Sequence, residues 1–191
     1  MFPIELQQAV EYLQSRVTAS RRHEDGRVNS IDDEDLIIDE LIAKYDDDVE
    51  KPAARTWYDV ILFGHKVNIK SSSMTGADNC NASKALLYCF TDAKLKSGWK
   101  HFYASLQSVV DTGRNYYFIV LDKNTGKVYL QSLFTLARLT PNGNNLPFQI
   151  VWKDNIVPRQ RTFQEAYDFL IGGFKESVKK LLEAHSEYEN L

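Results

Sequence analysis

The chain has few cysteines, few histidines and no long apolar run. Its two cysteines are too few and wrongly spaced for a zinc site, and its four histidines form no pair at helical or strand spacing. No apolar stretch is long enough to cross a bilayer, and the N-terminus lacks the basic and apolar regions of a signal peptide. We therefore expect a cytoplasmic protein with free thiols and no membrane partner.

Length and composition predict one globular domain, because 191 residues with 43% hydrophobic content can bury a sizeable core. Apolar periodicity predicts helices over 3–19, from Ser30 to about 45, over 82–90 and from 163 onward. Short apolar runs around turn residues predict hairpins over 57–70 and 116–133 and a strand over 148–152. The domain then comprises an N-terminal helix and loop (1–29), a core (30–161) and a C-terminal helix (162–191).

Charge is unevenly distributed along the chain, although the net charge is only −3. Residues 1–50 hold 5 Lys or Arg against 14 Asp or Glu, and residues 162–191 hold 3 against 6. Residues 51–161 hold 15 against 6. A protein that binds phosphates needs a local basic surface, so this middle segment could bind nucleic acid. Alternatively, the segments fold across one another and the charges mix.

The hairpin over 57–70 has Gly64-His65 between its arms, and glycine at the first position of a two-residue loop is typical of a type II′ turn. In that register Asp59 lies opposite Lys70, and one face is dry. The dry face comprises Tyr58, Val60, Leu62, Val67 and Ile69. The other face carries Asp59, Asn68 and Lys70 beside Ile61 and Phe63.

An acid, an amide and a lysine on one half-buried face suggest a metal site with a partner for water. Asp59 and Asn68 offer oxygen to a hard cation such as Mg²⁺, and Lys70 offers a positive donor to a nucleophile. Asp59 opposite Lys70 is equally typical of an ordinary cross-strand ion pair. The spacing alone leaves both interpretations open.

The second predicted helix contributes a further candidate acid. Ser30 is the expected N-cap, which places the acidic run 32–35 in the first turn. Glu34 shares the apolar stripe of this helix, whereas Glu40 points away from it. Glu34 is therefore the preferred acid, with Asp35 and Glu40 as alternatives. It could also serve only to complement the helix dipole.

Asp59, the run Asn68-Ile69-Lys70 and the serine- and asparagine-rich stretch after it resemble the catalytic core of type II restriction endonucleases in the PD-(D/E)XK nuclease superfamily. Tyr58 stands where proline usually precedes the acid, and Asn68 stands where Asp or Glu is usual, which removes one negative charge from the metal site. The resemblance implies an α/β fold with a restriction-endonuclease-like core, a central mixed β-sheet flanked by helices. Residues 1–191 would then form a single nuclease domain.

The resemblance also implies a sequence-specific double-stranded DNA endonuclease that uses Mg²⁺ and leaves a 5′-phosphate and a 3′-hydroxyl. Asp59, Glu34, Asn68 and Ile69 would hold the metal, and Lys70 would orient and help to deprotonate the water. The enzyme would act as a homodimer, alongside a cognate methyltransferase. A junction-resolving or repair nuclease, a non-catalytic DNA-binding protein on this fold, and an interaction module using the acidic helices are alternatives.

Polar loops beside the hairpin and between the later strands are candidates for DNA contact. The candidates are Ser71, Ser72, Ser73, Asn79, Asn81, Lys84, Arg138, Asn142, Asn144, Asn145, Arg159, Gln160 and Arg161. Asparagine can recognise adenine and arginine guanine, but loop asparagines more often form turns. The segment 94–103 interleaves basic with aromatic residues, which favours either nucleic-acid binding or a polar connector with one buried aromatic.

Overall fold

The computed structural model describes residues 2–19, 26–53, 56–79, 82–94, 96 and 98–186. The chain divides into two compact units, although its length and composition predict one domain. The first unit comprises Met1–Gly76 and Tyr116–Leu133, and the second comprises Ala77–Asn115 and Phe134–Leu191. The chain therefore leaves the first unit, returns to it for a hairpin and ends in the second. No helix among the described residues is long and apolar enough to span a membrane.

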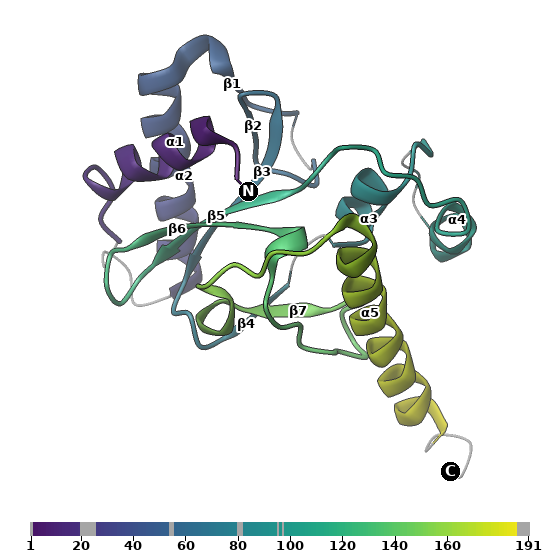
Figure 1. Cartoon of the computed structure of the whole chain (residues 1–191). Coiled ribbons are helices and arrows are strands. Elements are labelled where there is room, and N and C mark those ends of the chain that lie inside the picture. The colour runs from purple at the N-terminus through teal and green to yellow at the C-terminus, as the bar shows by residue number, and fades with distance from the viewer. Residues whose placement is uncertain are drawn as a thin grey trace. The chain divides into compact units, whose positions relative to one another are not determined.

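The first unit is an α/β structure built on a mixed five-stranded sheet (Figure 1). Its elements are α1 (Ile4–Gln14), α2 (Gly26–Tyr45), a 3₁₀ turn (Asp46–Asp48), β1 (Val49–Glu50), β2 (Val60–Leu62), β3 (His65–Ser72), β5 (Tyr117–Asp122) and β6 (Val128–Ser132). The strand order is β1-β2-β3-β5-β6. Strands β3 and β5 are parallel and the other neighbours are antiparallel. The α/β class and the mixed central sheet with flanking helices are confirmed.

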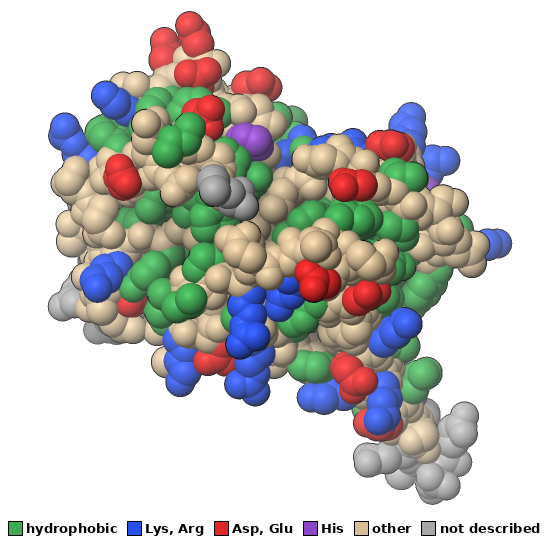
Figure 2. All heavy atoms as spheres, in the orientation of Figure 1, with side chains coloured by type: hydrophobic (Ala, Val, Ile, Leu, Met, Phe, Trp, Pro, Cys, Tyr) green, Lys and Arg blue, Asp and Glu red, His purple; other side chains and the backbone are tan. Residues whose placement is uncertain are grey.

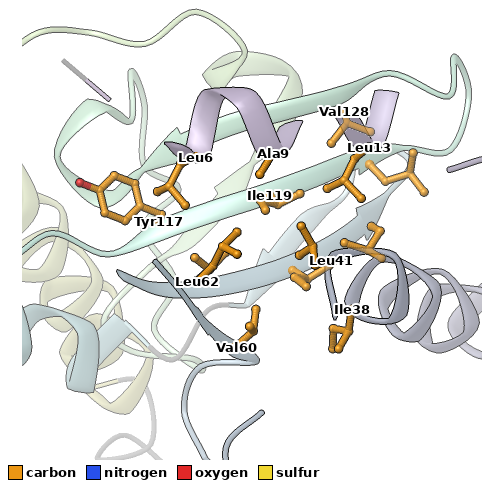
Figure 3. Close-up of a cluster of buried hydrophobic side chains, with 14 of the residues drawn as sticks. Leu6, Ala9, Leu13, Ile38, Leu41, Val60, Leu62, Tyr117, Ile119 and Val128 are labelled. Carbon is orange, nitrogen blue, oxygen red and sulfur yellow. The ribbon is translucent and has the colours of Figure 1, made fainter. Parts of the chain in front are cut away.

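The core of the first unit lies on one face of this sheet. Figure 3 shows Leu6, Ala9 and Leu13 of α1 and Leu41 of α2 directed toward side chains of the strands. The strand side chains in this core alternate along β3 and β5, so they come from a single face. Both helices therefore cover the same face, as amphipathic helices do when they bury one stripe.

The second unit contains three helices and a two-stranded sheet. Its elements are β4 (Ala77–Asn79), α3 (Ala82–Phe90), α4 (Trp99–Ser105), β7 (Gln149–Val151), a 3₁₀ turn (Trp152–Asn155) and α5 (Phe163–Ser186). Strands β4 and β7 are antiparallel. The helices predicted over 82–90 and from 163 are confirmed. Helix α4 and strand β4 occupy segments that the sequence predicts to be a connector and a loop.

The turn between β2 and β3 differs from the prediction. Leu62 pairs with His65, so the two-residue loop is Phe63-Gly64 and not Gly64-His65. Both loop residues have positive φ, at 51° and 76°, which is typical of a type I′ turn and not of type II′. Phe63 tolerates this conformation because its ring packs edge-on against Tyr45 at 5.0 Å and its amide donates to the Asp48 carbonyl.

The new turn shifts the hairpin register by two residues. Val60 pairs with Val67, and the Asp59 amide donates to the Val67 carbonyl, so Asp59 does not lie opposite Lys70. A shift of two preserves the side-chain faces, because strand side chains alternate with a period of two. The predicted dry face is therefore retained for Val60, Leu62, Val67 and Ile69, all fully buried.

Helix α2 begins at Gly26, four residues before the predicted N-cap. Ser30 therefore lies inside the helix, and its hydroxyl donates to the Ser71 carbonyl of β3 at 3.4 Å. The acidic run 32–35 consequently lies beyond the first turn, where the charge does not complement the helix dipole. Two of these acids, Asp33 and Glu34, instead contact side chains of β3.

Candidate active site

The candidate site lies in the first unit, at the edge of β3 where β2 ends. Beyond Val67, β3 pairs only with β5, so the edge that continues toward Ser72 has no strand partner among the described residues. A pocket of about 220 Å³ lies here, and both candidate carboxylates, Glu34 and Asp59, line it. Side chains from α2 and from the segment before β2 therefore meet at this pocket, and hydrogen bonds join both to β3.

One oxygen of Asp59 is fixed by two short hydrogen bonds. Its Oδ2 accepts from the Asn68 Nδ2 at 2.6 Å and from the Ile69 amide at 2.7 Å. Asp59 thus replaces the missing strand neighbour of β3 at this point. Both bonds use the same oxygen, so Oδ1 carries neither of them.

The amide of Asn68 leaves an acceptor without a partner. Its Oδ1 is buried and accepts no hydrogen bond within the described part of the chain. Unsatisfied buried acceptors are rare, and leaving one costs about 1–3 kcal/mol. Within one strand residue the N–H and C=O point to the same side, so the Ile69 carbonyl also points toward the edge that Asp59 occupies. The Ile69 carbonyl therefore adds a neutral oxygen at this edge, and the unpaired Asn68 Oδ1 lies buried next to it in sequence.

Lys70 pairs with Glu34 and not with its predicted cross-strand partner Asp59. Its Nζ lies 3.3 Å from Glu34 Oε1, and both side chains are about three-quarters buried, with 22% and 27% exposed. The adjacent residues reinforce this contact, because the Ser71 hydroxyl donates to Asp33 Oδ2 at 2.5 Å. Two consecutive residues of α2 thus bind two consecutive residues of β3.

Burial raises the pKa of both carboxyl groups in the site. The pKa of Asp59 is raised by desolvation, which exceeds the lowering by the Ile69 amide and by Lys70. The pKa of Glu34 is also raised by desolvation, partly offset by Lys70 and further raised by Asp59. The two acids repel one another, so a cation between them would relieve both effects.

The donor set suits a hard divalent cation. No group of three or more His, Cys, Asp or Glu side chains able to hold a metal occurs among the described residues. The carboxylates of Glu34 and Asp59 line the pocket, and the Ile69 carbonyl and the buried, unpaired Asn68 Oδ1 lie on the neighbouring strand beside Asp59. Mg²⁺ binds such oxygens and is commonly held by only one or two carboxylates, with water and phosphate completing its shell.

Of the alternative acids on α2, one lies at the pocket and one does not. Asp35 lines the same pocket as Glu34. Glu40 instead accepts a hydrogen bond from the Tyr12 hydroxyl at 2.9 Å, which holds it against α1. Glu34 remains the acid that contacts Lys70.

Comparison with models of protein families, with curated proteins and with solved structures finds no match to this chain.

Several predicted DNA-contact residues have structural roles. Ser71 and Ser72 are buried, and Ser72 Oγ accepts from the Met74 amide. Asn142 Oδ1 accepts from the amides of residues 144 and 145, which is the geometry of an Asx turn. Arg161 donates to two backbone carbonyls and covers the ring of Phe169 at 3.8 Å. In this conformation these four side chains are buried or already hydrogen-bonded within the protein.

Other predicted DNA-contact residues are accessible. Seven are exposed: Ser73, Asn79, Arg138, Asn144, Asn145, Arg159 and Gln160. Lys84 is half-buried. Asn79 accepts from Gln149 and Arg138 pairs with Asp154, both contacts that a ligand could displace. Asn81 lies outside the described residues. For the accessible residues, DNA contact stays a prediction.

The basic segment 51–161 is divided between the two units. By sequence the first unit holds 11 Lys or Arg against 16 Asp or Glu, and the second holds 12 against 10. Figure 2 shows acidic side chains gathered at the top of the view, where α2 passes into 46–48 and β1. The unit with the candidate site is therefore acidic overall, at −5, and the second unit is weakly basic.

Sequence reasoning missed the buried pair of Asp33 and Ser71. The usable signal was that each is adjacent to a predicted site residue, Glu34 and Lys70 respectively. Neighbouring residues on a helix point about 100° apart, so Asp33 can reach the Ser71 hydroxyl while Glu34 reaches Lys70. Asp33 is fully buried, which identifies it as part of the framework of the site.

Proposed function

We propose that this chain is a Mg²⁺-dependent endonuclease that cuts double-stranded DNA at a specific sequence, in the manner of type II restriction enzymes. The observation that supports the proposal most is that two hydrogen-bonded pairs, Asp59 with Asn68 and Glu34 with Lys70, lie beside a pocket that Asp59 and Glu34 line. These residues come from three separate stretches of sequence. An unpaired buried oxygen on Asn68 is the feature that a structural ion-pair network leaves unexplained.

The proposal gives each residue a role, and it gives Glu34 two. Asp59, Glu34, Asn68 Oδ1 and the Ile69 carbonyl hold the metal. When bound, Mg²⁺ stabilises negative charge on the phosphate oxygens and favours ionisation of water. Lys70 donates a hydrogen bond that orients the attacking water, and Glu34 holds the Lys70 ammonium in place. Asp33 and Ser71 position this pair.

The reaction joins the water oxygen to phosphorus and breaks the bond from phosphorus to the 3′ oxygen. The water releases a proton to solvent and the 3′ oxygen takes one up, so a 5′-phosphate and a 3′-hydroxyl remain. A homodimer would present two such sites to a short palindrome, and a cognate methyltransferase would protect the host DNA. The exposed arginines and asparagines of the second unit are the candidates for base contact.

The test is digestion of long linear DNA of mixed sequence, with Mg²⁺ and with EDTA. Discrete bands that require Mg²⁺ are expected from the wild type. Asp59→Asn and Lys70→Ala should each abolish them, whereas Lys127→Ala, an exposed lysine of the same unit, should not. Retained cleavage by either site variant would overturn the assignment.

A non-catalytic DNA-binding protein on the same fold is the second candidate. It is favoured by Asn68, whose neutral amide stands where a metal-binding carboxylate is usual and donates to Asp59. The net negative charge of the first unit also favours it, because that charge disfavours a phosphate at the candidate site. This candidate predicts a gel shift without cleavage at any Mg²⁺ concentration. Asn68→Asp should then create Mg²⁺-dependent cutting, because it adds the missing carboxylate.

A further inference from the structure

The second unit carries an aromatic surface that the proposed active site does not use. Trp99 and Tyr103, one turn apart on α4, are 42% and 46% exposed, although large aromatic side chains are usually buried. Between them on the helix, Phe102 is 3% exposed and forms the inner side of α4. The segment is therefore not a simple connector, because α4 buries one aromatic and presents two.

The exposed rings rest on a rigid base. Trp99 stacks on Phe174 of α5, with the rings 5.9 Å apart and 8° from parallel, and Tyr103 lies 5.9 Å from the same ring. His101 further holds the preceding segment by its contact with the Lys94 carbonyl at 2.9 Å. Rings held in this way lose little freedom when a ligand stacks on them.

Two pockets lie beside the exposed rings of Trp99 and Tyr103. One, of about 190 Å³, is lined by Trp99 and Phe102 with Lys84 and Lys96. The other, of about 280 Å³, is lined by Tyr103 and Phe174 with Lys175. Each pocket thus combines an aromatic wall with at least one lysine.

The charge around α4 is basic. Residues 82–106 contain Lys84, Lys94, Lys96 and Lys100 against a single acid, Asp92, which pairs with Arg114 at 2.9 Å. Figure 2 shows basic side chains on this part of the second unit, around α4 at the right of the view. Lysines are depleted in protein–protein interfaces, whereas aromatics interspersed with lysines are typical of single-stranded nucleic-acid surfaces.

We propose that the surface formed by Trp99, Tyr103, Lys96, Lys100 and Lys175 binds single-stranded DNA. Bases stack on the two rings and the lysines contact the phosphates. The ligand is single-stranded because base faces in a duplex are covered by neighbouring pairs and cannot stack on a side chain. The choice of DNA over RNA rests on the proposed nuclease function, whereas the argument for a base-stacking surface does not depend on that function.

The test is titration of the full-length protein with a thymidine oligomer in EDTA, where no metal-dependent cleavage can occur. Anisotropy of a fluorescently labelled oligomer measures binding by the wild type and by all variants, including Trp99→Ala, which lacks the indole ring. In the wild type, stacking should also quench tryptophan fluorescence, mostly from Trp99, because Trp152 is 2% exposed and Trp57 stacks on Tyr116. Trp99→Ala and Tyr103→Ala should each weaken binding about tenfold or more. The matched control is Leu182→Ala, an exposed apolar residue farther along α5, which should bind as the wild type does.

Lysine variants test the phosphate contacts without disturbing the packing of Trp99. Changing Lys96 and Lys100 together to Gln should reduce the slope of log K against log[salt] by about 1.4 for single strands. Lys127→Gln, in the first unit, should leave the slope unchanged.

Four results would overturn the proposal. These are no binding of the oligomer by the wild type, unchanged binding by both aromatic variants, markedly tighter binding of a uridine oligomer, and self-association in sedimentation that the aromatic variants abolish. Because the titration omits Mg²⁺, its failure is distinct from failure of the nuclease assay. Loss of cleavage with intact binding would refute only the proposed active site.

Discussion

Replacing Asp59 with Asn should make the folded protein more stable at neutral pH while abolishing cleavage. Burial raises the pKa of Asp59 above its ordinary value of 3.8, so the folded state holds a proton more tightly than the unfolded state. The stability that this difference provides is present below pH 3.8 and is lost as the pH rises through the raised pKa. An asparagine carries no charge at any pH and avoids that loss.

Comparing Asp59→Asn with Asp59→Ala gives the stability that the two hydrogen bonds to residue 59 contribute. In Asp59→Asn the amide oxygen can take the place of Oδ2 and keep the hydrogen bonds from Asn68 and Ile69. In Asp59→Ala both donors lose their partner, at about 1–3 kcal/mol each. The two variants should therefore differ by about 2–6 kcal/mol, or about 4–24 °C in Tm for a chain of this size.

Scanning calorimetry from about pH 2.5 to pH 7 measures these differences. The advantage of Asp59→Asn over the wild type should be near zero well below pH 3.8, where Asp59 is protonated in both states, and should grow as the pH rises through the raised pKa. A variant less stable than the wild type at pH 7 would contradict the assignment of a destabilising buried charge. Equal stability of the Asn and Ala variants would contradict the role of the two hydrogen bonds.

Three further substitutions test the framework by thermal unfolding. Ser71→Ala should destabilise by about 1–3 kcal/mol because buried Asp33 loses a donor, and a neutral result would remove that pair from the framework. Arg161→Ala should cost about 2–3 kcal/mol through its two carbonyl contacts, whereas exposed Arg159→Ala should stay within about 0.5 kcal/mol, and equal effects would contradict the distinction. Gly64→Ala should cost about 1 kcal/mol because its φ is +76°, and no loss would argue against the turn.

The elements that the sequence predicts well are those with strong local patterns. Helix α3 begins and ends at the predicted residues, and the hairpin over 117–132 has its turn around Gly126, where Asp122 accepts from Asn124 and Thr125. Such features depend on residues within a few positions of one another. Their periodicity and turn chemistry are therefore visible in the sequence.

The elements that were predicted wrongly depend on distant contacts. The turn at Phe63-Gly64 is stabilised by packing on Tyr45, eighteen residues away in sequence, and local preference for glycine could not reveal it. Ser30 has the chemistry of an N-cap but instead bonds β3 from inside α2. Tertiary contacts overrode the local signal in both cases.

In the candidate site, the grouping of Asp59, Asn68 and Lys70 on one hairpin can be predicted from the sequence, because a register shift of two leaves their faces unchanged. The partner of each group depends on tertiary packing. This packing pairs Lys70 with Glu34, joins Asn68 to Asp59 and leaves Asn68 Oδ1 unpaired. Such partners depend on how α2 packs against β3, and neither periodicity nor spacing along the chain encodes that packing.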